Sequence, residues 1–141
     1  MYGKTIRLKR VFPNDERRLF SVPLDHAVSM GPIDGLEELA PLASELQAGG
    51  ADLLIVTKGA VREVMPVLQP STMLGVHVSA STSLGPTSNL KVLVGTAAEA
   101  VSLGADLLSV QVNFGIPEEP ATTEVAKIVS LGLIGETVVS S

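Results

Sequence analysis

The chain of 141 residues contains no cysteine and no tryptophan, and aromatic residues make up only 3% of it. Without cysteine there is no disulfide bond, no thiolate metal ligand and no cysteine nucleophile, which is compatible with a reducing compartment. Basic residues are also few, since ten Lys and Arg stand against fifteen Asp and Glu for a net charge of -5. Because nucleic-acid binding requires a basic surface for the phosphates, this balance argues against such a partner.

Long hydrophobic runs are also missing. No stretch approaches the roughly 18 continuous apolar residues of a membrane span, and the basic N-terminal segment is not followed by the apolar run of an export signal. The composition is nevertheless 45% hydrophobic, enough for a sizeable core in one domain over residues 1–141. We therefore expect a cytoplasmic protein with no membrane partner.

A five-residue motif, Gly-Ala-Asp-Leu-Leu, occurs at residues 50–54 and again at residues 104–108. Each copy follows a helical pattern and leads into a β-branched run, so both predict a helix, a glycine stop and a strand. The helical pattern before the first copy covers residues 36–46, with Pro41 expected to kink it. The pattern before the second copy opens at residues 96–99 with the Thr and Glu of a capping box.

Four apolar runs predict buried strands, at residues 19–24, 53–57, 74–78 and 107–112. The connections between the runs are long enough to hold crossover helices, so the strands are expected to be parallel. This alternation predicts an α/β fold with about four parallel strands. A weaker alternative is a complete small doubly wound domain in which residues 133–139 form a fifth strand.

Each predicted strand ends in polar residues. Asp25 and His26 follow the first strand, Lys58 the second, Ser79 the third and Asn113 the fourth. Ligands of parallel α/β folds bind at the carboxyl ends of the strands, so a site is predicted there. A carboxylate held at a strand end, such as Asp25, suits proton transfer. The alternative is that Asp25 has only a structural role, as a helix N-cap or loop carboxylate.

Lys58 and His77 permit more than one interpretation. Lys58 closes an apolar strand, where a lysine contacts substrate, forms a Schiff base if it is buried, or lies in solvent. His77 lies within an apolar run and fits a core position as well as a site. Lys91 is expected to be solvated. Two histidines without a carboxylate cluster make no recognisable metal site, and no glycine-rich phosphate loop is present.

Period-two spacing places other polar residues on shared strand faces. Ser79, Ser81 and Ser83 alternate in one extended segment, and Gln111 and Asn113 alternate in another. Such residues are able to line a cavity and to bind a hydroxylated substrate.

Several separate blocks of the chain resemble a single family. They are residues 7–12 (RLKRVF), 22–33 (VPLDHAVSMGPI), 49–52 leading to 58–59, 77–84 (HVSASTSL), and 91–94 followed by 103–106. In order and spacing they are similar to the archaeal-type class I fructose-bisphosphate aldolases and the related 2-amino-3,7-dideoxy-D-threo-hept-6-ulosonate synthases. The continuation at residues 30–35 (MGPIDG) resembles the synthase branch more closely.

The resemblance implies a (βα)8 barrel, which needs about 250 residues, so the chain is expected to form the first half of one. It also implies a Schiff-base aldolase or transaldol-type synthase acting on a phosphorylated ketose or aldehyde, with no cofactor and no metal. In that family a lysine late in the barrel forms the imine and a tyrosine assists. Neither the strand that carries this lysine nor the strand that carries this tyrosine is recognisable in the chain. Its only tyrosine is Tyr2. We therefore expect no Schiff-base lysine in this chain and no activity of the chain alone.

Within that resemblance, Asp25 is the acid/base carboxylate. His26, Lys58, Ser79 and Asn113 are the candidate substrate-binding residues. The alternative is a non-catalytic half-barrel module that associates with itself or with a complementary half. Strands taken from a barrel leave unpaired edges and an apolar inner face, and both promote such pairing.

Overall fold

The computed structural model describes residues 2–12, 18–113 and 137–138. The helices are α1 (Tyr2–Val11), α2 (Ala27–Met30), α3 (Leu39–Ala48), α4 (Val61–Val64) and α5 (Ala97–Ser102), with a 3-10 turn η1 (Met65–Val67). The strands are β1 (Ser21–Pro23), β2 (Leu53–Thr57), β3 (Met73–His77), β4 (Ser79–Ala80), β5 (Val92–Leu93), β6 (Leu107–Ser109) and β7 (Thr137–Val138). Of the helices in these ranges, none has the length and apolar character needed to cross a membrane.

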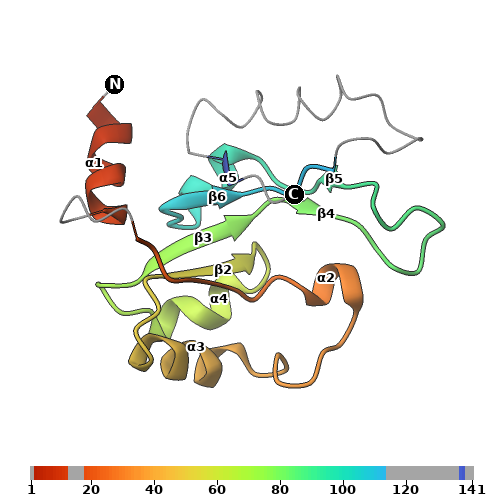
Figure 1. The fold of residues 1–141 in the computed structure, drawn as a ribbon, viewed down its shortest axis with the longest axis horizontal. Helices are drawn as coiled ribbons and strands as arrows, with labels where there is room; N and C mark the ends of the chain where they lie inside the picture. Colours follow the sequence, from red (N-terminus) through yellow and green to blue (C-terminus); the bar gives the residue numbers. More distant parts are fainter. Residues whose placement is uncertain (1, 13–17, 114–136, 139–141) are drawn as a thin grey trace.

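One parallel sheet organises the fold, with its strands in the order β1-β2-β3-β6-β7 (Figure 1). The four predicted strands are all present and parallel, although β1 and β6 are shorter than the apolar runs that predicted them. The short strand β7 lies within residues 133–139, and the rest of that range is outside the described residues. An antiparallel pair, β4 with β5, was not predicted.

The duplicated motif folds in the same way twice. Its glycine takes a positive φ in both copies, +91° at Gly50 and +89° at Gly104, and so ends the preceding helix. The alanine that follows donates a backbone hydrogen bond to the carbonyl five residues earlier, at 3.0 Å in each copy. Asp52 and Asp106 then each accept a backbone hydrogen bond at the start of the neighbouring strand, at 2.8 and 3.1 Å. The motif therefore joins each helix end to the sheet.

Pro41 occupies the third position of α3, which begins at Leu39 rather than at the start of the apolar pattern. Backbone N–H groups in the first turn have no partner within the helix, so proline removes no hydrogen bond there. Pro41 therefore gives no reason to expect a kink in α3.

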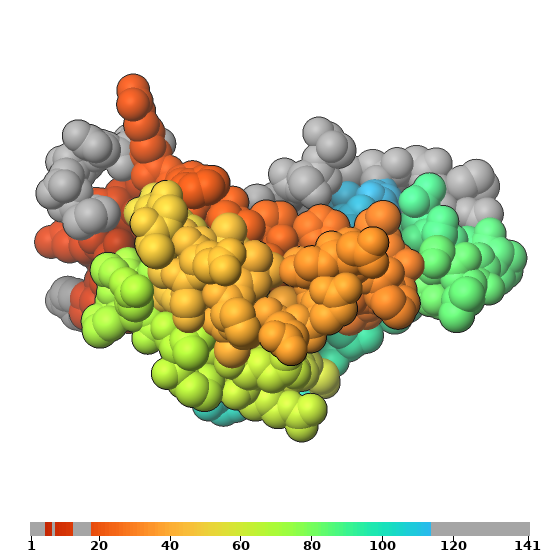
Figure 2. Space-filling view, turned by 90° about the horizontal axis from the view of Figure 1, so that it is seen from below, coloured from red at the N-terminus to blue at the C-terminus, as the bar shows by residue number. Residues whose placement is uncertain are grey.

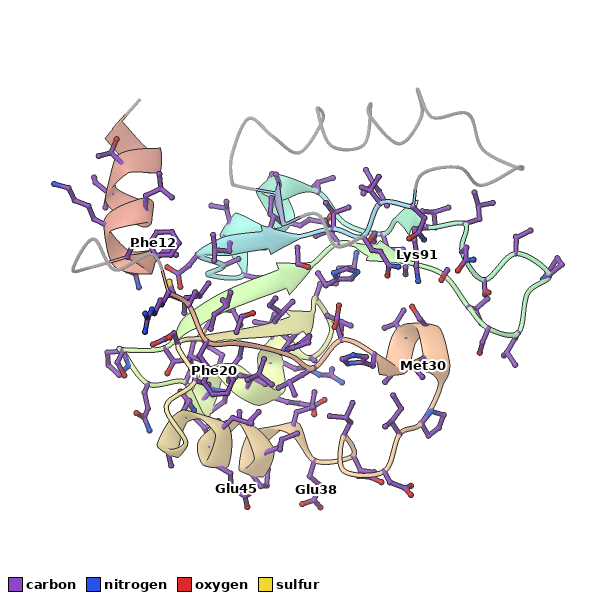
Figure 3. The ribbon with its side chains drawn as sticks, in the orientation of Figure 1. Phe12, Phe20, Met30, Glu38, Glu45 and Lys91 are labelled. Carbon is purple, nitrogen blue, oxygen red and sulfur yellow. The ribbon has the colours of Figure 1, made fainter. Side chains whose placement is uncertain are left out.

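Alternation along the strands separates two apolar clusters. The larger cluster joins one face of the sheet to α3, α4 and α5, and includes Ala43, Leu54, Val56, Val64, Leu74, Val76, Ala100 and Leu108. The smaller cluster lies at the amino ends of the strands and contains Val11, Leu53 and Met73, with Phe12 of the segment after α1 packed against it. Figure 3 shows Phe12 near these strand beginnings, and Glu38 and Glu45 on the outside of the molecule at α3. Among the described residues, α3, α4 and α5 thus cover one face, and α1 packs at the amino-end part of the other face, which leaves its carboxyl-end part for a site.

Strand register places polar residues of the face opposite α3, α4 and α5 in one layer. Thr57 of β2 pairs with His77 of β3, and His77 pairs with Ser109 of β6. Pro23 of β1 pairs with Ile55, two residues before Thr57. Because side chains alternate along a strand, Asp25 falls on the same face as Pro23 and near the same layer. Four strands therefore bring polar groups together at their carboxyl ends.

The segment that connects β4 and β5 extends away from the sheet. Figure 2 shows this part of the chain, drawn in green, protruding at one end of the molecule beside the face that α3 covers. Within the segment Leu84 is almost fully exposed. At its base, the backbone N–H of Ser83 donates to the carbonyl of Ser29 on α2, at 3.0 Å. The hairpin is thereby joined to α2 over the carboxyl ends of the strands.

The capping box at α5 gives a test of local stability. Thr96 accepts from the Glu99 N–H at 3.2 Å, and the Glu99 carboxylate accepts from the Thr96 N–H at 2.8 Å. We expect Thr96→Ala to lower the free energy of unfolding by about 1 kcal/mol, because it leaves a helix N–H without its partner. Urea denaturation measures the change against Ser88→Ala, a control on an exposed loop. Equal stability of the two variants would contradict the capping role.

Candidate active site

A cavity of about 410 Å³ opens at the carboxyl ends of the strands. This volume lies within the range of small-molecule sites, roughly 300–1,000 Å³. Figure 3 shows two of its lining residues, Met30 of α2 and Lys91 beside β5, on either side of the strand ends. The cavity is lined by Pro23, Asp25, His26, Ser29, Met30, Ile55, His77, Lys91, Ser109, Val110 and Gln111.

A chain of polar contacts leads from Asp25 into the protein. Asp25 Oδ2 lies 3.1 Å from His77 Nδ1, and His77 Nε2 lies 3.0 Å from Ser79 Oγ. Ser79 Oγ also accepts the backbone N–H of Gln111 at 2.8 Å. His77 Nδ1 is also hydrogen-bonded to Ser109 Oγ, at 2.9 Å. Because a serine hydroxyl both donates and accepts, these contacts fit either tautomer of the neutral imidazole.

His77 is neutral in this arrangement. Burial lowers the pKa of His77 below its ordinary value of 6.5, the negative charge of Asp25 opposes that change, and the positive charge of Lys91 adds to it. Loss of water around the charged imidazolium is the largest of these effects. The neutral imidazole thus lies beside Asp25 without placing a full positive charge next to the carboxylate.

Lys91 is a buried member of the site, with 7% of its surface exposed. Its Nζ donates to Ser81 Oγ at 2.7 Å and to Ser29 Oγ at 3.3 Å. Burial lowers the pKa of Lys91 from its ordinary value of 10.5, and the charge of Asp25 opposes this change. The expectation of a solvated lysine is wrong because the hairpin folds over the strand ends. No pattern in the sequence signals that contact.

The structure relates three predicted residues to the cavity in different ways. His26 lines the cavity, and its Nδ1 is 3.9 Å from Asp25 Oδ1. Ser79 is buried behind the cavity wall, where it contacts His77. Asn113 accepts a hydrogen bond from Gln111 Nε2 at 3.1 Å. Ser79 and Asn113 are therefore placed to orient residues that line the cavity.

Lys58 is separate from this group. It follows Thr57, whose side chain falls on the cavity face, so alternation turns Lys58 toward the helices. Its Nζ lies 3.5 Å from Glu99 Oε1 of α5, and 44% of its side chain is exposed. The hypothesis that Lys58 contacts substrate thus has no support from its position.

Metal ligands do not gather in the part of the chain that the structure describes. In that part no group of three or more His, Cys, Asp or Glu side chains is close enough together to hold a metal ion. The polar groups of the cavity are instead suited to hydrogen bonding and proton transfer.

Comparison with known families and sequences identifies clear relatives. The model of a family described as DeoC/LacD family aldolase matches residues 19–132. A 2-amino-4,5-dihydroxy-6-oxo-7-(phosphonooxy)heptanoate synthase from Streptomyces griseus is 41% identical over 81% of this chain and 42% of its own length. A 2-amino-3,7-dideoxy-D-threo-hept-6-ulosonate synthase from Halobacterium salinarum is 39% identical over 84% of this chain and 43% of its own length. The chain thus spans less than half of these relatives.

Solved structures share the fold. A Schiff-base-forming fructose-1,6-bisphosphate aldolase matches with a TM-score of 0.74 and 20% identity, over 96% of this chain and 56% of that one. An archaeal fructose-1,6-bisphosphate aldolase matches with a TM-score of 0.73 over 55% of its chain. The parallel sheet and its helices are therefore half of an aldolase-type (βα)8 barrel, as the sequence predicted.

The lowered pKa of His77 predicts a pH dependence of stability. The folded protein binds this proton less readily than the unfolded chain, so the free energy of unfolding is highest above pH 6.5 and decreases as the pH falls through the folded-state pKa. Urea denaturation between about pH 7.5 and pH 5 should show a smaller decrease for His77→Gln than for the unmodified chain. In the His26→Gln variant, where His77 is the one remaining histidine, its NMR titration midpoint is expected below 6.5. A midpoint above that value would disprove the assignment.

Proposed function

Because the chain belongs to the DeoC/LacD family of aldolases, we propose that it supplies the acid/base part of a Schiff-base aldolase or transaldol-type synthase. The substrate is a phosphorylated ketose or aldehyde. A 2-amino-3,7-dideoxy-D-threo-hept-6-ulosonate synthase is favoured over a fructose-bisphosphate aldolase, since synthases are the relatives at 39–41% identity and the aldolase structures stand at 20%. The observation that carries the proposal is the contact of 3.1 Å between Asp25 Oδ2 and Nδ1 of the neutral His77, in a cavity at the strand ends.

The proposed chemistry is a proton transfer by Asp25. In aldol cleavage a base accepts the proton of the substrate hydroxyl while the neighbouring carbon–carbon bond breaks, and in condensation the same group returns the proton. His77 Nδ1 lies 3.1 Å from Asp25 Oδ2, and Ser79 Oγ contacts the other ring nitrogen of His77, so these two residues keep the carboxylate in position.

The remaining candidate residues support this centre. We assign a substrate contact to His26, which borders the cavity beside Asp25. Ser79 and Asn113 act through His77 and Gln111 rather than on the substrate. By family resemblance the imine-forming lysine belongs to the portion of the relatives that this chain does not match. The 141 residues alone are therefore proposed to be inactive, as one domain that forms half of a barrel.

A second candidate function is a non-catalytic half-barrel that pairs with another copy or with a complementary half. Strand β1 lies at the edge of the sheet, and within the described ranges it pairs only with β2. A large apolar side chain is exposed next to this edge, since Phe20, the residue before β1, is 54% accessible. An open edge beside apolar surface favours the addition of a partner strand.

A chimera tests the catalytic proposal. In it, this chain replaces the matching segment of the Halobacterium salinarum synthase, so that the remaining part of the barrel comes from the relative. We expect the chimera to form the product of that synthase, and Asp25→Asn to lower its turnover roughly 100- to 10,000-fold because the proton acceptor is lost. The matched control is Asp34→Asn, an exposed carboxylate on the following loop.

Full turnover by the Asp25→Asn chimera would exclude Asp25 as the acid/base group. A chimera that is folded by circular dichroism but inactive before any substitution would favour the non-catalytic module.

Sedimentation velocity tests the pairing. The chain should sediment as a dimer or larger species at high concentration, and Phe20→Glu should weaken the association by about tenfold or more, because it places a charge at the apolar edge. Val101→Glu, on the exposed side of α5, is the control that should leave association unchanged. A well-folded monomer at every concentration would contradict the pairing and count against a half-barrel with an open edge.

A further inference from the structure

Gln111 lines the cavity but has no part in the proposed proton transfer. It follows β6, between Val110 and Val112, which are buried in the cluster that joins the sheet to α3, α4 and α5. Alternation therefore turns Gln111 to the cavity side, as it does Ser109. Ser109 pairs with His77, so Gln111 lies two residues, or about 7 Å of extended chain, further toward the open end of the sheet. Gln111 is thus one layer beyond the proton-transfer centre.

Two hydrogen bonds determine which way the Gln111 side-chain amide is turned. Asn113 Nδ2 donates to the backbone carbonyl of Asn89 in the β4–β5 hairpin, at 2.8 Å, and a carbonyl only accepts. Asn113 Oδ1 is thereby directed to Gln111 Nε2, at 3.1 Å. The reverse orientation of either amide would bring two oxygen atoms together. Nε2 therefore faces Asn113, and Oε1 is left as the acceptor of the Gln111 amide.

That acceptor is placed to meet a ligand. In the part of the chain that the structure describes, no group donates to Gln111 Oε1. The Gln111 backbone N–H donates to Ser79 Oγ at 2.8 Å, so the residue is held at both its main chain and its side chain. A ligand that displaces water from this oxygen must supply a hydrogen-bond donor, because an unpaired acceptor is costly once it is buried.

The charge of the acceptor indicates the kind of donor. A buried ammonium group requires a charged partner or several hydrogen bonds, whereas Gln111 offers one neutral oxygen. Lys91, which lines the same cavity, would also repel a second cation. A hydroxyl group has a single hydrogen to donate, so one neutral acceptor satisfies it.

We propose that Gln111 Oε1 accepts a hydrogen bond from a hydroxyl group of the substrate, on a carbon apart from the bond that forms or breaks. This inference rests on the proposed function, because that function places the reacting carbons at Asp25. Gln111 is then a specificity-determining residue, which selects substrates that carry this hydroxyl over those that lack it.

Butane-1,4-diol and 1,2-dimethoxyethane test the acceptor on the 141-residue chain. They are linear isomers, and the diol donates hydrogen bonds whereas the diether only accepts them. NMR titration should show a preference for the diol, and Gln111→Met should lower this preference by about fivefold, because a neutral hydrogen bond has a net effect of that order. Gln69→Met, the same substitution on an exposed loop, should leave the preference unchanged.

A measurement on the unsubstituted chain keeps the test independent of whether Gln111→Met folds. A carbonyl carbon is deshielded when its oxygen accepts a hydrogen bond. The ¹³C resonance of the Gln111 side-chain carbonyl should therefore move downfield with the diol and stay in place with the diether.

The chimera with the Halobacterium salinarum synthase tests the same residue in turnover. Gln111→Met should raise KM by about fivefold, with a smaller effect on kcat, because a contact apart from the reacting bond is made in the substrate complex as well as in the transition state. Asp25→Asn should lower kcat instead, so the hydroxyl contact and the proton-transfer role fail separately.

Three results would overturn the acceptor role of Gln111. They are an equal effect of Gln111→Met on both probes, a Gln111 carbonyl resonance that the diol does not move, and no binding of either probe. Butane-1,4-diamine brings charged donors of similar length. If it binds more tightly than the diol and Gln111→Met removes that advantage, the group recognised is an ammonium and the hydroxyl assignment is wrong.

Discussion

The contact between Asp25 and His77 joins the ends of β1 and β3 across the intervening strand β2, and the site depends on it. It exists because parallel pairing fixes the register of these strands and because side chains alternate along them. A carboxylate and an imidazole on one face at the same height are then close enough to share a proton, at 3.1 Å. The chemistry of the cavity is thus a direct consequence of sheet geometry.

Polar groups in this position require partners, since a buried donor or acceptor without one is costly. The protein provides these partners one after another. Ser79 Oγ contacts the second ring nitrogen of His77, and the backbone N–H of Gln111 donates to Ser79 Oγ. On the opposite side, Lys91 is held by two serines from α2 and the hairpin. The described residues thus form two groups of polar side chains at one cavity, one around Asp25 and His77 and the other around Lys91.

Much of the fold was predictable because its signals are local. The repeated Gly-Ala-Asp-Leu-Leu motif, the capping box at Thr96 and the four apolar runs each depend on neighbours a few residues away. Asp25 was predictable for the same reason, since a carboxylate directly after a buried strand marks the strand end. Lys58 satisfied the same pattern but faces Glu99, because its position in the alternation turns it to the helix side. A shift of one residue separates the two outcomes.

The sequence by itself determined the order of strands and helices, the glycine stops between them and the carboxylate at the end of the first strand, because hydrophobic periodicity and backbone preference act over short distances. Only the tertiary structure decided that His77 belongs to the site rather than to the core, that Lys91 is buried and that Lys58 is not part of the cavity. Those assignments depend on register between strands and on a hairpin folding over them, and both arise from packing between residues that are far apart in the chain.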